Sequence, residues 1–255
     1  MKRTNLANSI PDDYFSNWLE YCEKNRKNHL KYLGKIERIT PTEAQRIHHS
    51  VQEFQLGEAS EGLQLIKHAQ RWSQKIDNPD YIKIIKLFIG EENRHSRYLA
   101  EFLKSQNLTL GTESFTDKAF RAIRNSFGLE MSIRVLAAAE IIATIYYPCL
   151  RMATSNEYLK SICLRITEEE IEHVKFQMQN LAALNIEKNE ILFRFSNLLH
   201  LFFILGTSIM ILPIHSPVIQ SKYGNNPINF LKVVIGETKK YLSLIKQLRE
   251  RLILP

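Results

Sequence analysis

The chain has 255 residues, of which 44% are hydrophobic and 24% are charged. This composition is ordinary for a folded protein and excludes an intrinsically disordered chain. We expect one domain over residues 1–255, long enough to bury a sizeable core.

The formal charge of +7 is concentrated near the two ends of the chain. Residues 1–40 contain eight basic and five acidic side chains, and residues 216–255 contain seven basic and two acidic ones. A basic surface can attract nucleic acid, anionic lipid or an anionic substrate, although solvated charge is the commoner interpretation.

The three cysteines, Cys22, Cys149 and Cys163, have no Cys-x-x-Cys spacing. We interpret them as small buried side chains, and their odd number argues against a secreted disulfide scaffold. The first residues open no apolar run, so we expect no signal peptide and a cytoplasmic protein.

Helical periodicity dominates and no segment alternates convincingly as a strand would, so the predicted fold class is all-α. Residues 11–38 predict one or two N-terminal helices. The Thr-Pro-Thr-Glu capping box at residues 40–43 predicts the start of a helix that runs to about Lys75. An Asn-Pro-Asp turn at residues 78–80 leads into the next helix, whose apolar stripe spans residues 81–102.

The second half of the chain predicts another helical hairpin. Its helices have apolar faces over residues 133–147 and 159–173, joined by a polar turn at residues 154–156. A four-helix bundle with this order needs one long crossover between its second and third helices. We predict a short helix over residues 116–125 within the crossover and a break near residues 125–128.

Residues 187–255 predict a C-terminal helical extension packed on the core. Residues 191–214 are strongly apolar, but the uncharged part, residues 201–214, is shorter than a membrane span. We therefore expect a buried helix rather than a transmembrane segment. The Asn226-Pro227 pair predicts the start of a final basic amphipathic helix.

Two Glu-x-x-His motifs, Glu92 to His95 and Glu170 to His173, lie on apolar helix faces. Glutamate and histidine three residues apart share one face of a helix, and charge on an apolar face is costly unless it is paired or bound to metal. Each motif follows another inward glutamate by about one hairpin. Glu61 precedes Glu92 by 31 residues, and Glu140 precedes Glu170 by 30.

These spacings place the four glutamates and two histidines at one level of a bundle, where they predict a dinuclear metal site. In this assignment Glu61 and Glu140 each bind one ion, Glu92 and Glu170 bridge the pair, and the histidines each bind one ion. Glu58 lies one turn before Glu61 on the same face and is the alternative to it. A shell of oxygen and nitrogen without thiolate suits iron or manganese better than structural zinc.

Neighbouring residues leave further alternatives open. Glu91, Glu169 and Glu172 either orient ligands or are solvated. Tyr98 and Tyr147 are either redox-active or packing residues, with packing favoured. Thr144 either borders the metal pocket or, as we favour, bonds to its own helix backbone. His48, His49, His68 and His200 fit no ligand scheme.

The motifs and their order resemble the ferritin-like di-iron carboxylate superfamily over residues 42–182. The segment Glu91 to His95 with the Asn78-Pro79 turn is similar to the tRNA-modifying hydroxylases. The same motif with Tyr147-Pro148 is also similar to the aldehyde-deformylating oxygenases. The resemblance implies a ferritin-like four-helix bundle with one long crossover, two iron ions or a manganese–iron pair, and O2 as co-substrate.

The function expected from this resemblance is a non-haem di-iron oxygenase or oxidase that hydroxylates or otherwise oxidises an organic substrate. The alternatives are a ferroxidase or peroxide-detoxifying protein, and a tRNA-modifying hydroxylase. We expect a small organic substrate and an electron donor as partners, while tRNA and a homodimer stay open.

Overall fold

The computed structural model describes residues 10–11, 13–59, 62–112 and 128–254. Within these residues every regular element is a helix, which confirms the all-α prediction. The helices are α1 (Ser16–Arg26), α2 (Pro41–Glu58), α3 (Leu63–Lys75), α4 (Asp80–Ser105), α6 (Gly128–Ala153), α7 (Glu157–Leu184), α8 (Glu190–Tyr223) and α9 (Pro227–Ile253).

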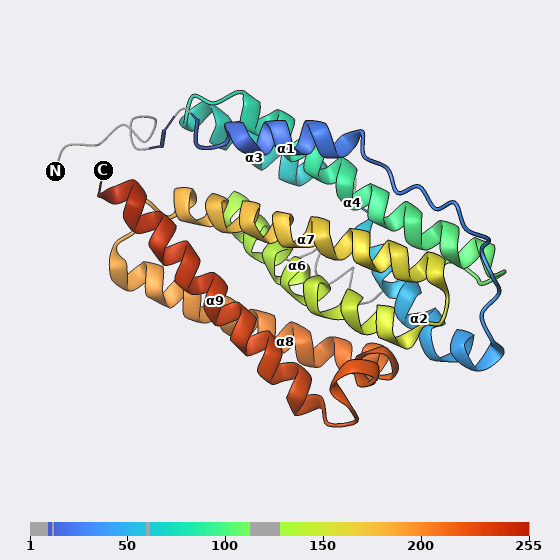
Figure 1. The fold of residues 1–255 in the computed structure, drawn as a ribbon. Helices are drawn as coiled ribbons and strands as arrows, with labels where there is room; N and C mark the ends of the chain where they lie inside the picture. The colour runs from blue at the N-terminus through green and yellow to red at the C-terminus, as the bar shows by residue number, and fades with distance from the viewer. Residues whose placement is uncertain (1–9, 12, 60–61, 113–127, 255) are drawn as a thin grey trace.

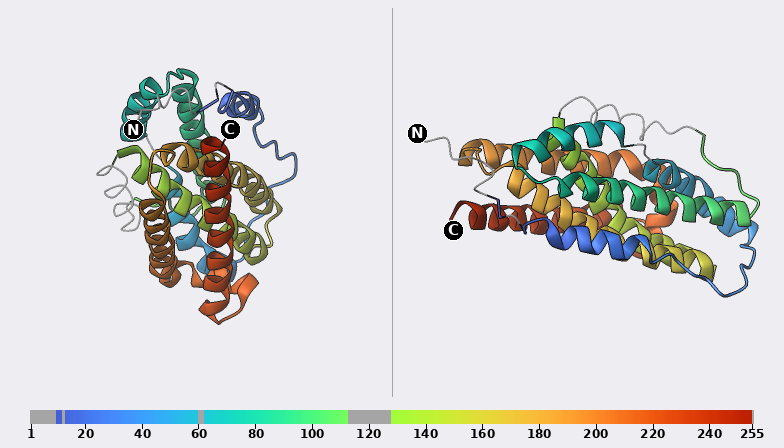
Figure 2. Two further views of the ribbon diagram at one scale, coloured as in Figure 1. Left: turned by 90° about the vertical axis from the view of Figure 1, so that its left-hand side faces the viewer. Right: turned by 90° about the horizontal axis from the view of Figure 1, so that it is seen from above.

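The helices pack as long rods in layers (Figure 1). In this view α6 and α7 lie between α1 and α4 above and α8 and α9 below. The two further views in Figure 2 show the same rods from the side that bears the chain termini and from above. Helix α4 contacts α1, α2, α3 and α7, while α9 contacts α6, α7 and α8.

Polar caps set several helix starts where the sequence predicts them. The side chain of Thr40 accepts a hydrogen bond from the Glu43 amide, and Pro41 occupies the first turn of α2. Asn156 caps α7 in the same way, and Asn226 caps α9 immediately before Pro227. These contacts satisfy amide groups that a helix start leaves unpaired.

The predicted continuous helix over residues 41–75 is wrong, because it is divided between α2 and α3. Gly62 takes a left-handed conformation with φ of 64° at the start of α3. A Cβ at this position would lie 2.3 Å from the Cδ1 of Ile89, so the close approach of α4 also requires glycine. The break makes Glu58 the last residue of α2.

The N-terminal helical prediction for residues 11–38 holds only for α1. Beyond it the chain runs without helix to the cap of α2 and is tied to α4 by side chains. The hydroxyl of Tyr98 accepts from the Leu30 amide at 2.8 Å, and the side chain of Gln106 accepts from the Ile39 amide at 2.9 Å. The short helix and the break predicted for the crossover fall mainly in residues 113–127, outside the described part of the chain.

Two apolar clusters lie on either side of a polar layer in the bundle. On α4, one cluster takes residues 81–89 and the other residues 98–103, so that Glu91, Glu92 and His95 lie between them. On α7 the clusters take residues 158–166 and 174–183, and Glu169, Glu170 and His173 again lie between. The acidic and histidine side chains of this layer therefore lie in the middle of α4 and α7 rather than at their ends.

Among the described residues, two helices are long and apolar enough to cross a membrane by length and composition alone, α6 and α8. The most apolar window of α6 is 83% buried inside the protein, as expected of a core helix, whereas that of α8 is 33% buried. The prediction that residues 191–214 form a buried helix is thus correct for one face of α8 and wrong for the other. The covered face carries His200, Thr207 and Ser208, whereas large apolar side chains lie on the exposed face. Because burial here does not follow hydrophobicity, the sequence periodicity could not identify the covered face.

Candidate metal centre

A buried group of acidic and imidazole side chains occupies the polar layer. Glu58, Glu92, His95 and Glu170 each place one oxygen or nitrogen so that all four atoms lie within 4.8 Å of one another. They come from the end of α2, the middle of α4 and the middle of α7. This group could bind a metal ion, because its atoms converge closely and carry the charge that a cation requires.

The second histidine extends the same cluster. Nδ1 of His173 lies 2.9 Å from Oε1 of Glu92 and 3.8 Å from Oε2 of Glu170. On the other side, Nδ1 of His95 lies 3.1 Å from Oε1 of Glu170 and 3.9 Å from Oε1 of Glu92. Each of these two glutamates therefore faces both imidazoles, whose ring centroids are 5.6 Å apart.

Each histidine is held from behind by the glutamate that immediately precedes the other motif. Nε2 of His95 donates to Glu169 at 2.7 Å, and Nε2 of His173 donates to Glu91 at 2.9 Å. The contacts cross between α4 and α7 because the beginning of each motif faces the end of the other. Since a carboxylate can only accept, each Nε2 carries the hydrogen and each neutral ring presents the lone pair of Nδ1 to the cluster.

The glutamate behind His95 is itself fixed by three donors. Oε1 of Glu169 accepts from Asn25 at 2.6 Å and from Arg94 at 2.8 Å, and it lies 2.6 Å from Nη2 of Arg165. These cations and His95 outweigh the effect of burial, so the pKa of Glu169 is held well below its usual range. Glu91 is less supported, because its nearest cation is Arg94 at 3.8 Å.

Glu140 and Glu58 border the cluster from α6 and α2. Glu140 is 2% exposed, and one of its oxygens accepts from Gln177 at 3.0 Å. Glu58 accepts from the hydroxyl of Tyr147 at 2.6 Å. Each carboxylate thus has one oxygen held by a neutral donor on another helix.

Several buried atoms of the cluster have no hydrogen-bond partner among the described residues. They are Nδ1 of both histidines, Oε1 of Glu92, Oε2 of Glu140 and both side-chain oxygens of Glu170. Leaving such groups unpaired costs free energy, and a bound cation removes that cost. The unpaired atoms are oxygens and imidazole nitrogens, a donor set that fits iron or manganese.

Burial and mutual repulsion keep protons on the cluster when no cation is bound. Burial raises the pKa of Glu92 to about 7, and the carboxylates of Glu170 and Glu58 contribute to the rise. Burial also raises the pKa of Glu140 well above its usual range. For Glu170 burial acts in the same direction, but the two nearby histidines outweigh it and lower its pKa.

The imidazoles complete this pattern. Burial disfavours the charged form of His95, yet the nearby carboxylates of Glu169, Glu170 and Glu58 raise its pKa well above the usual value. The pKa of His173 is raised in the same way by its carboxylate partners. A metal ion therefore has to displace protons from the ring nitrogens and from Glu92 in order to bind.

The structure brings together four of the six predicted ligands, Glu92, His95, Glu170 and His173, and it also places the alternative Glu58 with them. Glu140 is buried on α6 and interacts electrostatically with His173, Glu92 and Glu170. Glu61 lies outside the described residues. The residues that support the cluster, Asn25, Arg94, Arg165 and Gln177, were not predicted. Only Arg94 had a local signal in the sequence, since it lies between the two motif residues Glu92 and His95.

Other sequence alternatives are decided by local contacts. Thr144 donates to the backbone oxygen of Ile141 at 2.8 Å, as favoured from the sequence. Glu172 forms a surface ion pair with Lys175 at 2.6 Å, so it is the solvated glutamate of the three neighbours. His200 is buried and bonded to the backbone oxygen of Arg134.

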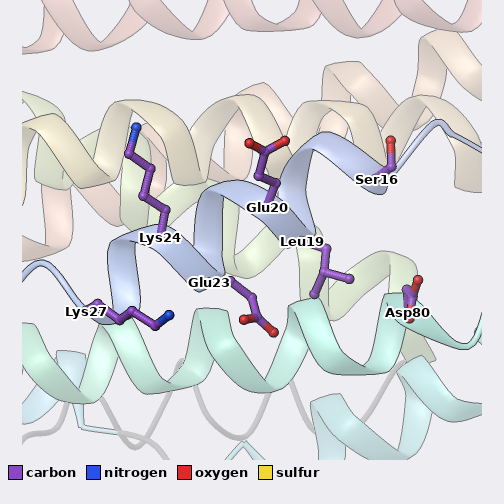
Figure 3. Close-up of a pocket in the computed structure, with 7 residues that line it drawn as sticks. All are labelled: Ser16, Leu19, Glu20, Glu23, Lys24, Lys27 and Asp80. Carbon is purple, nitrogen blue, oxygen red and sulfur yellow. The ribbon is translucent and has the colours of Figure 1, made fainter.

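An open surface hollow lies between α1 and the beginning of α4 (Figure 3). Leu19 and Glu23 point from α1 toward α4 there, and Asp80 lies at one end of the hollow. Lysines and acidic residues both line it, and its lining residues include no member of the metal cluster. The hollow is therefore separate from the candidate metal centre.

Comparison with protein-family models, with curated proteins and with solved structures finds no match to this chain. What the fold and site define is an all-helical protein with a buried Glu/His cluster able to hold metal.

Proposed function

We propose that this protein is a non-haem di-iron oxidoreductase that uses O2 to oxidise an organic substrate. The observation that carries the proposal is the position of Glu170 between the two imidazoles. One of its oxygens faces Nδ1 of His95 at 3.1 Å and the other faces Nδ1 of His173 at 3.8 Å. A carboxylate with one oxygen toward each of two nitrogen ligands is suited to bridge two metal ions.

The other ligands are assigned to the two ions by the side of Glu170 on which each one lies. Glu58 and His95 would hold one ion, and Glu140 and His173 would hold the other, with Glu92 as the second bridge. Two histidines and four carboxylates are the ligand set that helical bundles use for paired iron or manganese ions. Glu58 is placed at this ion because its Oε2 lies 3.6 Å from Nδ1 of His95, and Glu61, which lies outside the described residues, stays the alternative ligand.

When two ferrous ions are bound, such a centre supplies the electrons that activate O2 for oxidation of a carbon centre. The chain contributes orientation and exclusion of water. The ring of Phe88 packs edge-on against His173 at 4.8 Å, and Ile166 is fully buried one turn before Glu170. Repeated turnover would require an external electron donor, because one cycle leaves the iron oxidised.

The test is anaerobic loading with Fe(II), followed by exposure to O2 and Mössbauer spectroscopy. We expect two irons per chain and a spin-coupled ferric pair. A control variant, Glu172→Gln, changes a surface glutamate on the same helix and should behave like the wild type. A wild-type protein that binds one iron or none and shows no spin-coupled signal would contradict the proposal. Release of ferric iron during repeated additions of Fe(II) and O2 would instead indicate iron oxidation as the function.

A further inference from the structure

Helix α8 presents an apolar face that no described part of the chain covers. Residues 195–221 include no Asp, Glu, Lys or Arg. The large apolar side chains on this face are between 37% and 80% exposed, namely Ile191, Leu192, Phe195, Leu198, Leu199, Phe202, Ile209 and Met210. Their burial would be favourable, and a contiguous apolar surface of this length usually marks an interface.

The exposed face is symmetric about Gly206. Moving outward from this glycine, exposed positions recur at steps of 4, 7, 11 and 14 residues in both directions. The matched pairs are Phe202 with Met210, Leu199 with Pro213, Phe195 with Pro217 and Leu192 with Gln220. Alternating steps of four and three residues are the spacing of helix-to-helix seams. In a two-fold pair the same patch meets its own copy, so that residue i of one helix packs against residue j of the other and j against i.

Gly206 lies at the centre of this symmetry and leaves room for a second helix. Glycine costs an exposed helix about 1 kcal/mol relative to alanine. A Cβ at Gly206 would meet nothing within 4 Å in its own chain, so no internal contact requires the residue to be small. A second helix that packs closely against α8 at this point would explain the glycine, because a side chain here would keep the two backbones apart.

The area is also sufficient for a dimer. A fully exposed side chain of this size presents on the order of 170 Å². With the measured exposures, the eight side chains would bury roughly 700 Å² on each copy, close to the ~800 Å² per partner of a standard interface. A helix that lies on a membrane surface instead carries Lys and Arg along its polar side and Trp or Tyr near its edges. The exposed face of α8 has neither over residues 195–221.

We infer that α8 is a homodimer interface, in which two copies pair antiparallel about a two-fold axis that passes near Gly206. This inference is independent of the metal centre, because no ligand of the cluster lies on α8.

The first test is the solution mass of the full chain by light scattering during gel filtration at micromolar concentration. We expect twice the chain mass of 29.8 kDa. Phe202→Glu places charge beside the axis and should weaken the dimer by roughly 30-fold or more. Ile228→Glu changes a similarly exposed apolar residue on α9 and should leave the mass unchanged. Circular dichroism of each variant confirms that it remains folded.

The second test uses disulfide formation to measure whether the Gly206 positions of two copies lie close together. Paired helices that approach at glycine bring their Cα atoms within the roughly 4.4–6.8 Å that a disulfide needs. Gly206→Cys should therefore oxidise rapidly to a covalent dimer, since the native Cys22, Cys149 and Cys163 are all buried. Gly236→Cys, at an equally open glycine on α9, is the matched control and should cross-link slowly.

Three results would overturn the inference. These are a wild-type monomer at micromolar concentration, a Phe202→Glu dimer as tight as the wild type, or equal cross-linking of the two cysteine variants. A monomer that floats with vesicles of anionic phospholipid would also overturn it and assign the α8 face to a membrane.

Discussion

The two Glu-Glu-x-x-His segments, residues 91–95 and 169–173, occupy equivalent positions but receive unequal support. Behind His95, Glu169 is fixed by Asn25, Arg94 and Arg165. Behind His173, Glu91 has one cation at 3.8 Å and an oxygen with no hydrogen-bond partner. A ligand whose own partner is fixed keeps its orientation, so we expect the position at His95 to bind metal more tightly.

The largest effect is expected where the two halves share a ligand. Glu170→Gln removes the charge and one acceptor oxygen from the residue that faces both imidazoles, so metal binding should weaken by roughly 100-fold or more at both positions. Metal content after dialysis measures this, with Glu172→Gln as the control on the same helix. Retention of two tightly bound ions by Glu170→Gln would show that Glu170 does not bridge.

Removing one histidine at a time should separate the two positions. His95→Ala and His173→Ala should each bind fewer than two irons per chain in an anaerobic Fe(II) titration. His173→Ala should keep close to one iron, because the better supported position survives, and His95→Ala should keep less. If both variants still bind two, the ligand assignment is wrong.

The supporting glutamates give a smaller and more discriminating effect. Glu169→Gln should weaken metal binding by about 10- to 100-fold, whereas Glu91→Gln should weaken it by only a few-fold. Glu169→Gln should also lower the free energy of unfolding by about 3 kcal/mol, because it leaves Arg94 and Arg165 buried without their carboxylate. Fe(II) titration and urea denaturation measure both quantities, and equal effects from the two variants would contradict unequal support.

The last effect is the dependence of metal binding on pH. The pKa of Glu92 is raised to about 7, and those of His95 and His173 are raised as well, so protons compete with metal increasingly as the pH falls. The gain in unfolding free energy on adding Mn(II) should therefore be greater at pH 7.5 than at pH 5.5 by about 1.4 kcal/mol or more, which corresponds to at least a tenfold change in affinity.

The test uses the change in unfolding free energy on metal addition, rather than the unfolding free energy itself, because two buried histidines also make stability depend on pH. Burial lowers the pKa of His200 and of His215 to about 3. A lowered histidine pKa stabilises the folded state at neutral pH and loses that effect as the pH falls below about 6.5. Because these residues contribute equally with and without metal, they cancel. A metal-dependent gain that is equal at the two pH values would exclude proton competition.

Local patterns predicted the features that depend on neighbours in sequence. The caps at Thr40, Asn156 and Asn226 are short-range signals, and the spacing of the Glu-x-x-His motifs places each pair on one helix face. The division between α2 and α3 could not be predicted in this way. It depends on how closely Ile89 approaches Gly62, which is a contact between helices.

The supporting residues of the metal centre were hidden for the same reason. Asn25 is 144 positions from Glu169 in the chain, so no periodicity links them. The crossed contacts of Glu91 and Glu169 with the opposite histidines depend on how α4 packs against α7. The uncovered face of α8 needed coordinates too, because the face that packs on the bundle carries polar side chains such as His200, Thr207 and Ser208.

Anomalous X-ray scattering from crystals loaded anaerobically with Fe(II) tests the dinuclear centre most directly. We expect two iron peaks about 3.5–4 Å apart, one beside Nδ1 of His95 and the other beside Nδ1 of His173, with Glu170 between them. A single peak, or iron bound only outside the cluster, would contradict the dinuclear assignment.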